Sequence, residues 1–187
     1  KTIDNHGTSI IFTQAGALAS LGINNSPLAI CVNSLTQLAY RMDGLPVTYL
    51  IRKVLQNKNL DSAAHALKTL PHATGHNYLI GDNNNFLNFE CSANQTTLID
   101  NSTNHNIFHT NHILQNNDLR VTSTEASLAM EQRIKESSLP RYQCLHNQLH
   151  DRSSLSALNA KKLLATQPVS ISLNKKLKQF TFISTVF

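Results

Sequence analysis

Two short apolar segments on either side of an asparagine-rich turn constrain the fold of this chain more than any other feature. The segments are residues 75–82 and 86–92, and the turn is Asp82-Asn83-Asn84-Asn85. Short apolar runs that flank a cluster of turn-forming residues are typical of a β-hairpin. The sequence therefore predicts an antiparallel hairpin near the middle of the chain.

A third apolar segment, residues 107–112, is predicted as a further strand close to this hairpin. It ends in four polar residues, His109-Thr110-Asn111-His112. Buried polar side chains need hydrogen-bond partners, and a packed sheet alone gives no reason to place four of them together. We therefore expect the chemistry of the molecule to lie at this strand end.

The remaining elements predict a layered α+β domain that covers residues 1–187. Apolar periodicity separates segments with strand spacing from segments with helical spacing. Pro46 opens the first helix and Asp61 is expected to cap the second. A succession of strands, helices, strands, helices and strands favours an α+β fold over a parallel βαβ fold. The predicted strands are 8–13, 19–23, 28–32, 95–100, 169–173 and 180–187, and the predicted helices are 46–55, 62–70, 126–136, 139–150 and 155–165.

Composition excludes some classes of function. The sequence has no run of about 18 apolar residues that could cross a bilayer. The net charge of +5 comes from Lys and Arg residues spread along the chain, which favours solubility over nucleic-acid binding. Cys31, Cys91 and Cys144 are far apart in apolar contexts, so each is predicted to be a small buried residue. Without a disulfide framework a cytoplasmic location is favoured, although the localisation stays open.

Four segments in this order resemble the penicillin acyltransferase family. They are Gly-Ile-Asn-Asn-Ser-Pro-Leu-Ala-Ile-Cys-Val-Asn-Ser-Leu at 22–35, Gly-His-Asn-Tyr-Leu-Ile-Gly-Asp at 75–82, Glu90, and His-Thr-Asn-His at 109–112. This family consists of N-terminal nucleophile hydrolases, to which the choloylglycine hydrolases are more distantly related. The resemblance implies a four-layer αββα sandwich. It also implies an amidohydrolase or acyltransferase that acts on the linear amide bonds of small amide or acyl substrates through an acyl-thioester. No cofactor is expected, and a coenzyme A thioester is among the acyl donors that such an enzyme could use.

The same resemblance implies roles for three residues. Asn33 matches the family position whose amide helps to hold the developing oxyanion, and Asn111 resembles the second oxyanion-stabilising asparagine. Arg141 resembles the late arginine beside the nucleophile, where a guanidinium stays charged and lowers a thiol pKa or orients substrate. The hypothesis requires Asn33 and Asn111 to meet at one cleft. Asn77 is expected to be structural and Glu90 to be a buried, hydrogen-bonded carboxylate.

One departure from the family concerns the nucleophile. The family uses a cysteine exposed at a new N-terminus by autocatalytic cleavage, whereas this chain begins with Lys1, and Cys31 lies inside a predicted strand. We therefore expect a piece of such an enzyme, truncated at both ends and inactive alone, with the missing N-terminal segment of its precursor as partner. The alternative is a non-catalytic binding or structural domain that keeps the fold.

Histidines offer a competing interpretation of the same region. His72, His76, His105, His109 and His112 could be taken for a metal site. His109 and His112 are three residues apart, so their side chains would point to opposite faces of a strand, which is poor ligand geometry. Partnered core and rim histidines are the favoured interpretation.

Overall fold

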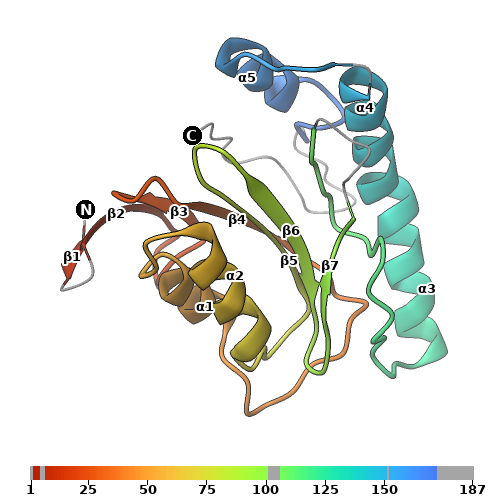
Figure 1. Cartoon of the computed structure of the whole chain (residues 1–187). Coiled ribbons are helices and arrows are strands. Elements are labelled where there is room, and N and C mark those ends of the chain that lie inside the picture. The colour runs from red at the N-terminus through yellow and green to blue at the C-terminus, as the bar shows by residue number, and fades with distance from the viewer. Residues whose placement is uncertain (1, 5–6, 101–105, 151, 172–187) are drawn as a thin grey trace. The chain divides into compact units, whose positions relative to one another are not determined.

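The computed structural model of the chain describes residues 2–4, 7–100, 106–150 and 152–171 (Figure 1). The chain divides into two compact units. The first comprises residues 1–99 and 113–121, and the second comprises residues 100–112 and 122–187. The single domain predicted for residues 1–187 stays a prediction.

The described part of the first unit contains a seven-stranded antiparallel sheet, in which neighbouring strands are also neighbours in sequence, from β1 to β7. The predicted early meander and the central hairpin are confirmed. At the hairpin turn, the Asp82 carboxylate accepts the backbone N–H groups of Asn84 and Asn85 at 2.9 Å, which explains why an Asp-Asn turn joins these strands. The strands are β1 (Thr2–Asp4), β2 (Gly7–Phe12), β3 (Leu21–Asn24), β4 (Ala29–Ser34), β5 (His76–Gly81), β6 (Phe86–Cys91) and β7 (Thr96–Leu98).

Two helices, α1 (Val47–Val54) and α2 (Leu60–Thr69), pack against one face of this sheet (Figure 1). The apolar residues of α1 recur at helical spacing, so they lie on one face of the helix. They pack against apolar side chains that occupy every second position of the strands. The fully buried members of this core include Leu28, Ile30, Leu50, Ile51, Leu67, Tyr78, Ile80 and Phe89.

The start of α2 differs from the prediction. Its N-cap is Asn59, whose side-chain oxygen accepts the Ser62 backbone N–H at 2.9 Å, and Asp61 lies inside the first turn. An acidic side chain there still favours the helix through its dipole. The prediction that Asp61 caps this helix was therefore wrong by two positions. Asn and Asp are both good N-cap residues, and only the backbone geometry decides which of the two caps the helix.

The opposite face of the sheet carries a polar row. Cross-strand pairing places Asn33 beside Asn77, and Asn77 beside Glu90. Paired residues of antiparallel strands share a face, and neighbours along a strand alternate between faces. Because Tyr78 and Phe89 face the helices, Asn33, Asn77 and Glu90 lie on the other side.

Helices dominate the described part of the second unit. A small core joins Leu145, Leu149 and Leu163 to the partly buried Phe108, Leu155 and Val169. The predicted helix start at Ser123 is confirmed, since its hydroxyl accepts the Ala126 backbone N–H. The helices are α3 (Thr124–Arg133), the π-helix η1 (Ile134–Ser138), α4 (Leu139–Leu149) and α5 (Ala157–Ala165).

Two predicted strands of the C-terminal half were wrong where the structure describes them. Residues 107–112 have no regular secondary structure, because side-chain hydrogen bonds rather than a ladder hold this segment. Residues 169–171 form a turn and a bend. The rest of the predicted strand 169–173, and all of 180–187, lie outside the described residues.

Candidate active site

Asn111 and Arg141 are in direct contact in the second unit. The Arg141 Nη2 atom donates to Asn111 Oδ1 at 2.9 Å, although thirty positions separate the two residues. A guanidinium has only donors, so the amide oxygen must face Arg141. The Asn111 Nδ2 group is therefore a hydrogen-bond donor that points away from the arginine.

The first turn of α4 holds the Arg141 side chain in place. Its Nε atom donates to the Ser137 carbonyl oxygen at 3.2 Å, one turn earlier. Burial lowers the pKa of Arg141 from its ordinary value, but a guanidinium keeps its charge at any working pH. The result is a fixed, partly buried cation beside an amide.

Asn33 occupies the first unit, in β4, on the polar face of the sheet. The structure thus brings two of the three predicted site residues together, Asn111 and Arg141, and places Asn33 in the other unit. The roles of all three stay predictions at this point.

The residues beside Asn33 agree with their predicted structural roles. Asn77 is fully buried, and its Nδ2 atom donates to the Phe89 carbonyl at 3.1 Å and to Asn88 Oδ1. Glu90 is also fully buried, and its carboxylate accepts three successive backbone N–H groups, from Leu114, Gln115 and Asn116, at 2.7, 2.9 and 2.7 Å. The buried, hydrogen-bonded carboxylate predicted for Glu90 is confirmed, and the structural role of Asn77 stays a prediction that its burial and contacts support.

Sequence reasoning missed Ser138. This residue is 2% exposed, and its hydroxyl contacts the backbone nitrogen of Asn111 and the ring of His112. Pro140 was the one feature of the sequence that could have drawn attention to Ser138. A proline inside a helical pattern disturbs the backbone of the preceding turn, and Ser138 lies in that turn.

His72, His76, His109 and His112 have hydrogen-bond partners, as the favoured interpretation predicted. His72 Nε2 contacts the Leu67 carbonyl at 2.8 Å, and His112 Nδ1 contacts the Ser138 hydroxyl at 2.8 Å. The strand argument about His109 and His112 was wrong, since the segment is not a strand. His105 lies outside the described residues. Within the described ranges, no group of three or more His, Cys, Asp or Glu side chains is arranged to hold a metal ion.

Cys91 is fully buried, as predicted, whereas Cys31 and Cys144 are partly exposed and the prediction was wrong for these two. Burial of the thiol nevertheless raises the pKa of Cys31 to about 11 and that of Cys91 to about 12. Both are therefore neutral thiols near pH 7, which makes them poor nucleophiles.

These pKa values predict slow alkylation of Cys31 and Cys91 in the folded protein. At pH 8 only about one in a thousand Cys31 thiols would be ionised, and the ionised fraction of Cys91 would be smaller still. Iodoacetamide should therefore modify Cys144 first, as mass spectrometry of peptides can measure, with the urea-unfolded protein as the control that labels all three. Labelling of Cys91 at the rate seen in urea would contradict this expectation.

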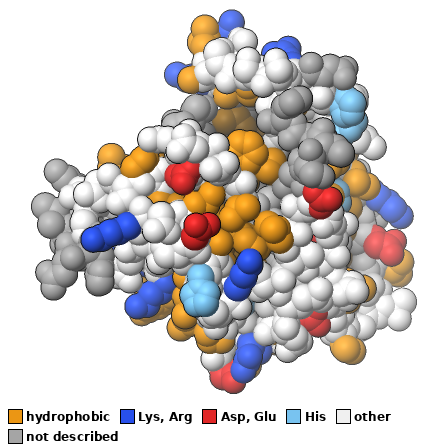
Figure 2. Space-filling view, viewed as in Figure 1, with side chains coloured by type: hydrophobic (Ala, Val, Ile, Leu, Met, Phe, Trp, Pro, Cys, Tyr) orange, Lys and Arg blue, Asp and Glu red, His pale blue; other side chains and the backbone are white. Residues whose placement is uncertain are grey.

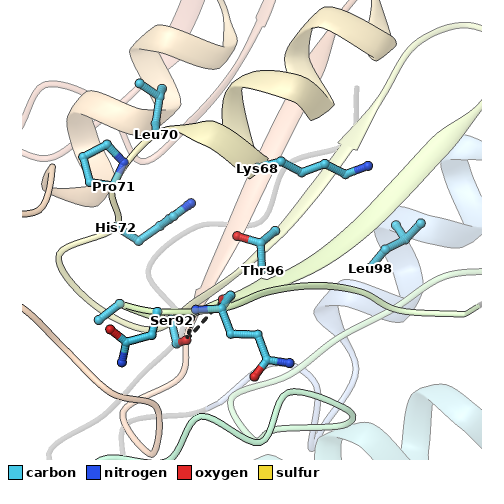
Figure 3. A pocket seen from close by; sticks show the side chains of 10 residues that line it. Lys68, Leu70, Pro71, His72, Ser92, Thr96 and Leu98 are labelled. Atoms are coloured by element: carbon cyan, nitrogen blue, oxygen red, sulfur yellow. Dashed lines mark hydrogen bonds between the residues drawn. The ribbon is translucent and has the colours of Figure 1, made fainter.

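A pocket of about 550 Å³ lies in the first unit, beside α2 and β7. Figure 3 shows Lys68, Pro71 and His72 around this pocket, with Thr96 and Leu98 of β7. Its lining contains none of the predicted site residues.

On the face seen in Figure 2, Lys and Arg side chains lie singly among uncharged and acidic ones.

The chain as a whole matches a known family. A family model for acyl-coenzyme A:6-aminopenicillanic acid acyl-transferase matches residues 7–180. The chain belongs to this family. The predicted resemblance to the penicillin acyltransferases is therefore confirmed, and with it membership of a group of amidohydrolases and acyltransferases of the N-terminal nucleophile type. A search of curated proteins found no match.

Two solved structures share the fold of this penicillin acyltransferase family member. One is a Caenorhabditis elegans ortholog of N-acylethanolamine-hydrolyzing acid amidase, with a TM-score of 0.54, 14% identity, and coverage of 87% of this chain and 74% of that chain. The other is penicillin V acylase from Agrobacterium tumefaciens, with a TM-score of 0.50, 14% identity, and coverage of 89% and 57%. The chain thus spans little more than half of the acylase. The predicted α+β class is confirmed, and the fold matches that of N-terminal nucleophile hydrolases over most of the chain.

Among the described residues, no helix is both long enough and apolar enough to cross a bilayer.

Proposed function

We propose that this chain is part of a cysteine N-terminal nucleophile enzyme that cleaves or exchanges a linear amide bond through an acyl-thioester. In this proposal the nucleophilic cysteine belongs to an N-terminal segment of the same precursor that precedes Lys1, and the chain alone is inactive. The observation that carries the proposal is the contact between Asn111 and Arg141, which turns the Asn111 amide into an oriented donor beside a cation.

An oriented amide donor suits acyl transfer for an electrostatic reason. When a thiolate attacks an amide carbonyl, a C–S bond forms and an electron pair moves onto the oxygen. Neutral N–H donors held in place stabilise this oxyanion without titrating themselves. Asn111 would be one donor and Asn33 the second, while the positive charge of Arg141 would favour the thiolate form of the incoming cysteine.

Collapse of the tetrahedral intermediate breaks the C–N bond. The α-amine of the N-terminal cysteine, which the family resemblance implies as base, would pass the thiol proton to the departing amine. Water then releases the acid from the thioester, whereas a second amine would give acyl transfer. Neither branch needs a metal, and a coenzyme A thioester would serve only as an acyl donor in the transfer branch.

The substrates proposed are small molecules with one acyl group joined to one amine. The two related structures carry names that refer to N-acylethanolamines and to penicillin V, both of which contain such an amide. The missing segment would also complete the fold, by supplying the first strands of a four-layer αββα sandwich.

The test uses the full-length protein, incubated with N-acyl amines of different chain length. We expect release of the amine together with a mass increase on one cysteine that equals the acyl group minus one hydrogen. Hydroxylamine should remove this adduct, because thioesters react with it. A full-length protein that releases no amine and forms no adduct would instead support the non-catalytic binding or structural domain.

A further inference from the structure

Ser138 lies at the end of η1 in the second unit, three residues before Arg141. Residues three apart share one side of a helix, so the two side chains reach the same neighbour. That neighbour is Asn111, whose amide oxygen accepts from Arg141 Nη2 at 2.9 Å and whose backbone N–H donates to Ser138 Oγ at 2.7 Å. One turn of helix thus holds Asn111 at its side chain and at its backbone.

The hydrogen bonds around Ser138 form a chain in which each proton can be assigned. The Thr110 hydroxyl donates to the Ser138 carbonyl at 3.1 Å, so its oxygen is left to accept the Ser138 hydroxyl proton at 3.0 Å. A serine hydroxyl has one proton and two acceptor positions. Ser138 Oγ therefore accepts the Asn111 N–H. His112 Nδ1 lies 2.8 Å from Ser138 Oγ and 3.1 Å from Thr110 Oγ1, and because both hydroxyl protons are already engaged, Nδ1 has to be the donor in these contacts. This assignment makes Nδ1 the protonated nitrogen of His112.

Pro140 explains why the helix presents Ser138 in this way. Proline lacks an N–H group, and its ring clashes with the carbonyl four residues earlier, here that of Glu136. The helix widens over η1, where the Leu139 N–H bonds to the Ile134 carbonyl, five residues back. Such π-turns inside α-helices are frequent at functional sites.

We infer that Ser138 is a positioning residue that holds the backbone of Asn111. Together with Arg141, which binds the side-chain oxygen of Asn111, it fixes the direction in which the Asn111 Nδ2 group points. The hydroxyl of Ser138, a residue that is 2% exposed as a whole, is the centre of the network. Thr110 and His112 complete the support on either side of Asn111. The effect on catalysis rests on the proposed function, whereas the effect on the Asn111 backbone does not.

The first experiment measures amide hydrolysis by the full-length protein carrying Ser138→Ala. We expect kcat to fall about 10- to 100-fold with little change in KM, because a misplaced donor weakens transition-state binding more than substrate binding. Ser138→Thr, which keeps the hydroxyl, should recover part of the loss. Ser127→Ala on α3 is the matched control and should leave kcat unchanged.

A double-mutant cycle separates positioning from a general structural role. If Ser138 acts through Asn111, Ser138→Ala should cost almost nothing further in a protein that already carries Asn111→Ala. A loss of the same size in both backgrounds would overturn the inference.

The second experiment needs no turnover, so it still decides the matter if the proposed function fails. NMR with ¹⁵N labelling should show His112 protonated at Nδ1 and an Asn111 amide proton shifted downfield by its hydrogen bond. In Ser138→Ala both signals should move while the signals of the sheet stay in place. Unchanged Asn111 and His112 signals would overturn the inference whatever the activity assay shows.

Discussion

Replacing Asn111 with aspartate should lower kcat of the full-length protein by about 100- to 1,000-fold, the usual cost of losing one oxyanion donor. Aspartate has nearly the same shape and still accepts from Arg141, so the contact at 2.9 Å would be kept as an ion pair. The Nδ2 donor is lost, and a negative charge is added that would repel the oxyanion and offset the charge of Arg141. Asn111→Asp therefore tests the electrostatics of the site while the shape of the side chain is nearly kept.

Asn111→Ala removes both the donor and the contact to Arg141, and we expect a loss of kcat at least as large. The matched control is Asn147→Ala, an exposed asparagine on α4, which should leave the steady-state parameters unchanged. The measurement is kcat and KM for an N-acyl amine, with circular dichroism to verify folding. Wild-type kcat in a folded Asn111→Asp protein would refute the assignment of Asn111.

Glu90→Ala should lower the free energy of unfolding by at least about 3 kcal/mol. Its fully buried carboxylate accepts the backbone N–H groups of Leu114, Gln115 and Asn116. Hydrogen bonds to a charged group contribute about 1.5–3 kcal/mol each, and buried donors that lose their partner carry a desolvation penalty. Urea denaturation followed by circular dichroism measures the change.

Two variants calibrate the Glu90 result. Glu90→Gln keeps one acceptor oxygen but turns an NH₂ group toward the backbone donors, so its loss should be intermediate. Glu131→Ala removes a carboxylate from an exposed pair with Lys135 at 3.5 Å and should cost no more than about 0.5 kcal/mol. Equal urea midpoints for Glu90→Ala and Glu131→Ala would show that the three N–H groups find other partners.

Local patterns predicted the elements whose hydrogen bonds are local. The hairpin at 76–91 was predictable because strand alternation and the turn chemistry of Asp82 agree. The early meander was predictable in the same way. At α2 the predicted cap was Asp61, whereas the structure has Asn59 in that place, and this choice depends on backbone angles that propensity does not encode.

The segment 107–112 shows where such reasoning fails. Its apolar start and polar end are compatible with a strand, yet its hydrogen bonds go to Ser138, which lies 26 to 28 positions away. No short-range pattern contains that pairing. Asn111 and Arg141 were found through the ordered family motifs, whereas Ser138 belongs to a chain with many serines and has a role only because of its neighbours.

The order of strands in the sheet also bears on how the first unit forms. Every strand pairs with its sequence neighbour, and most of these pairings close short loops. The exception is β4 with β5, which are joined through both helices and lie 42 positions apart at the pair Ser34 and His76. Loop closure costs more entropy as loops lengthen, and non-local pairing slows folding. We therefore expect the β4–β5 pairing to be the slowest of the described strand pairings to form, since the chain has to be present as far as β5 before β4 can pair.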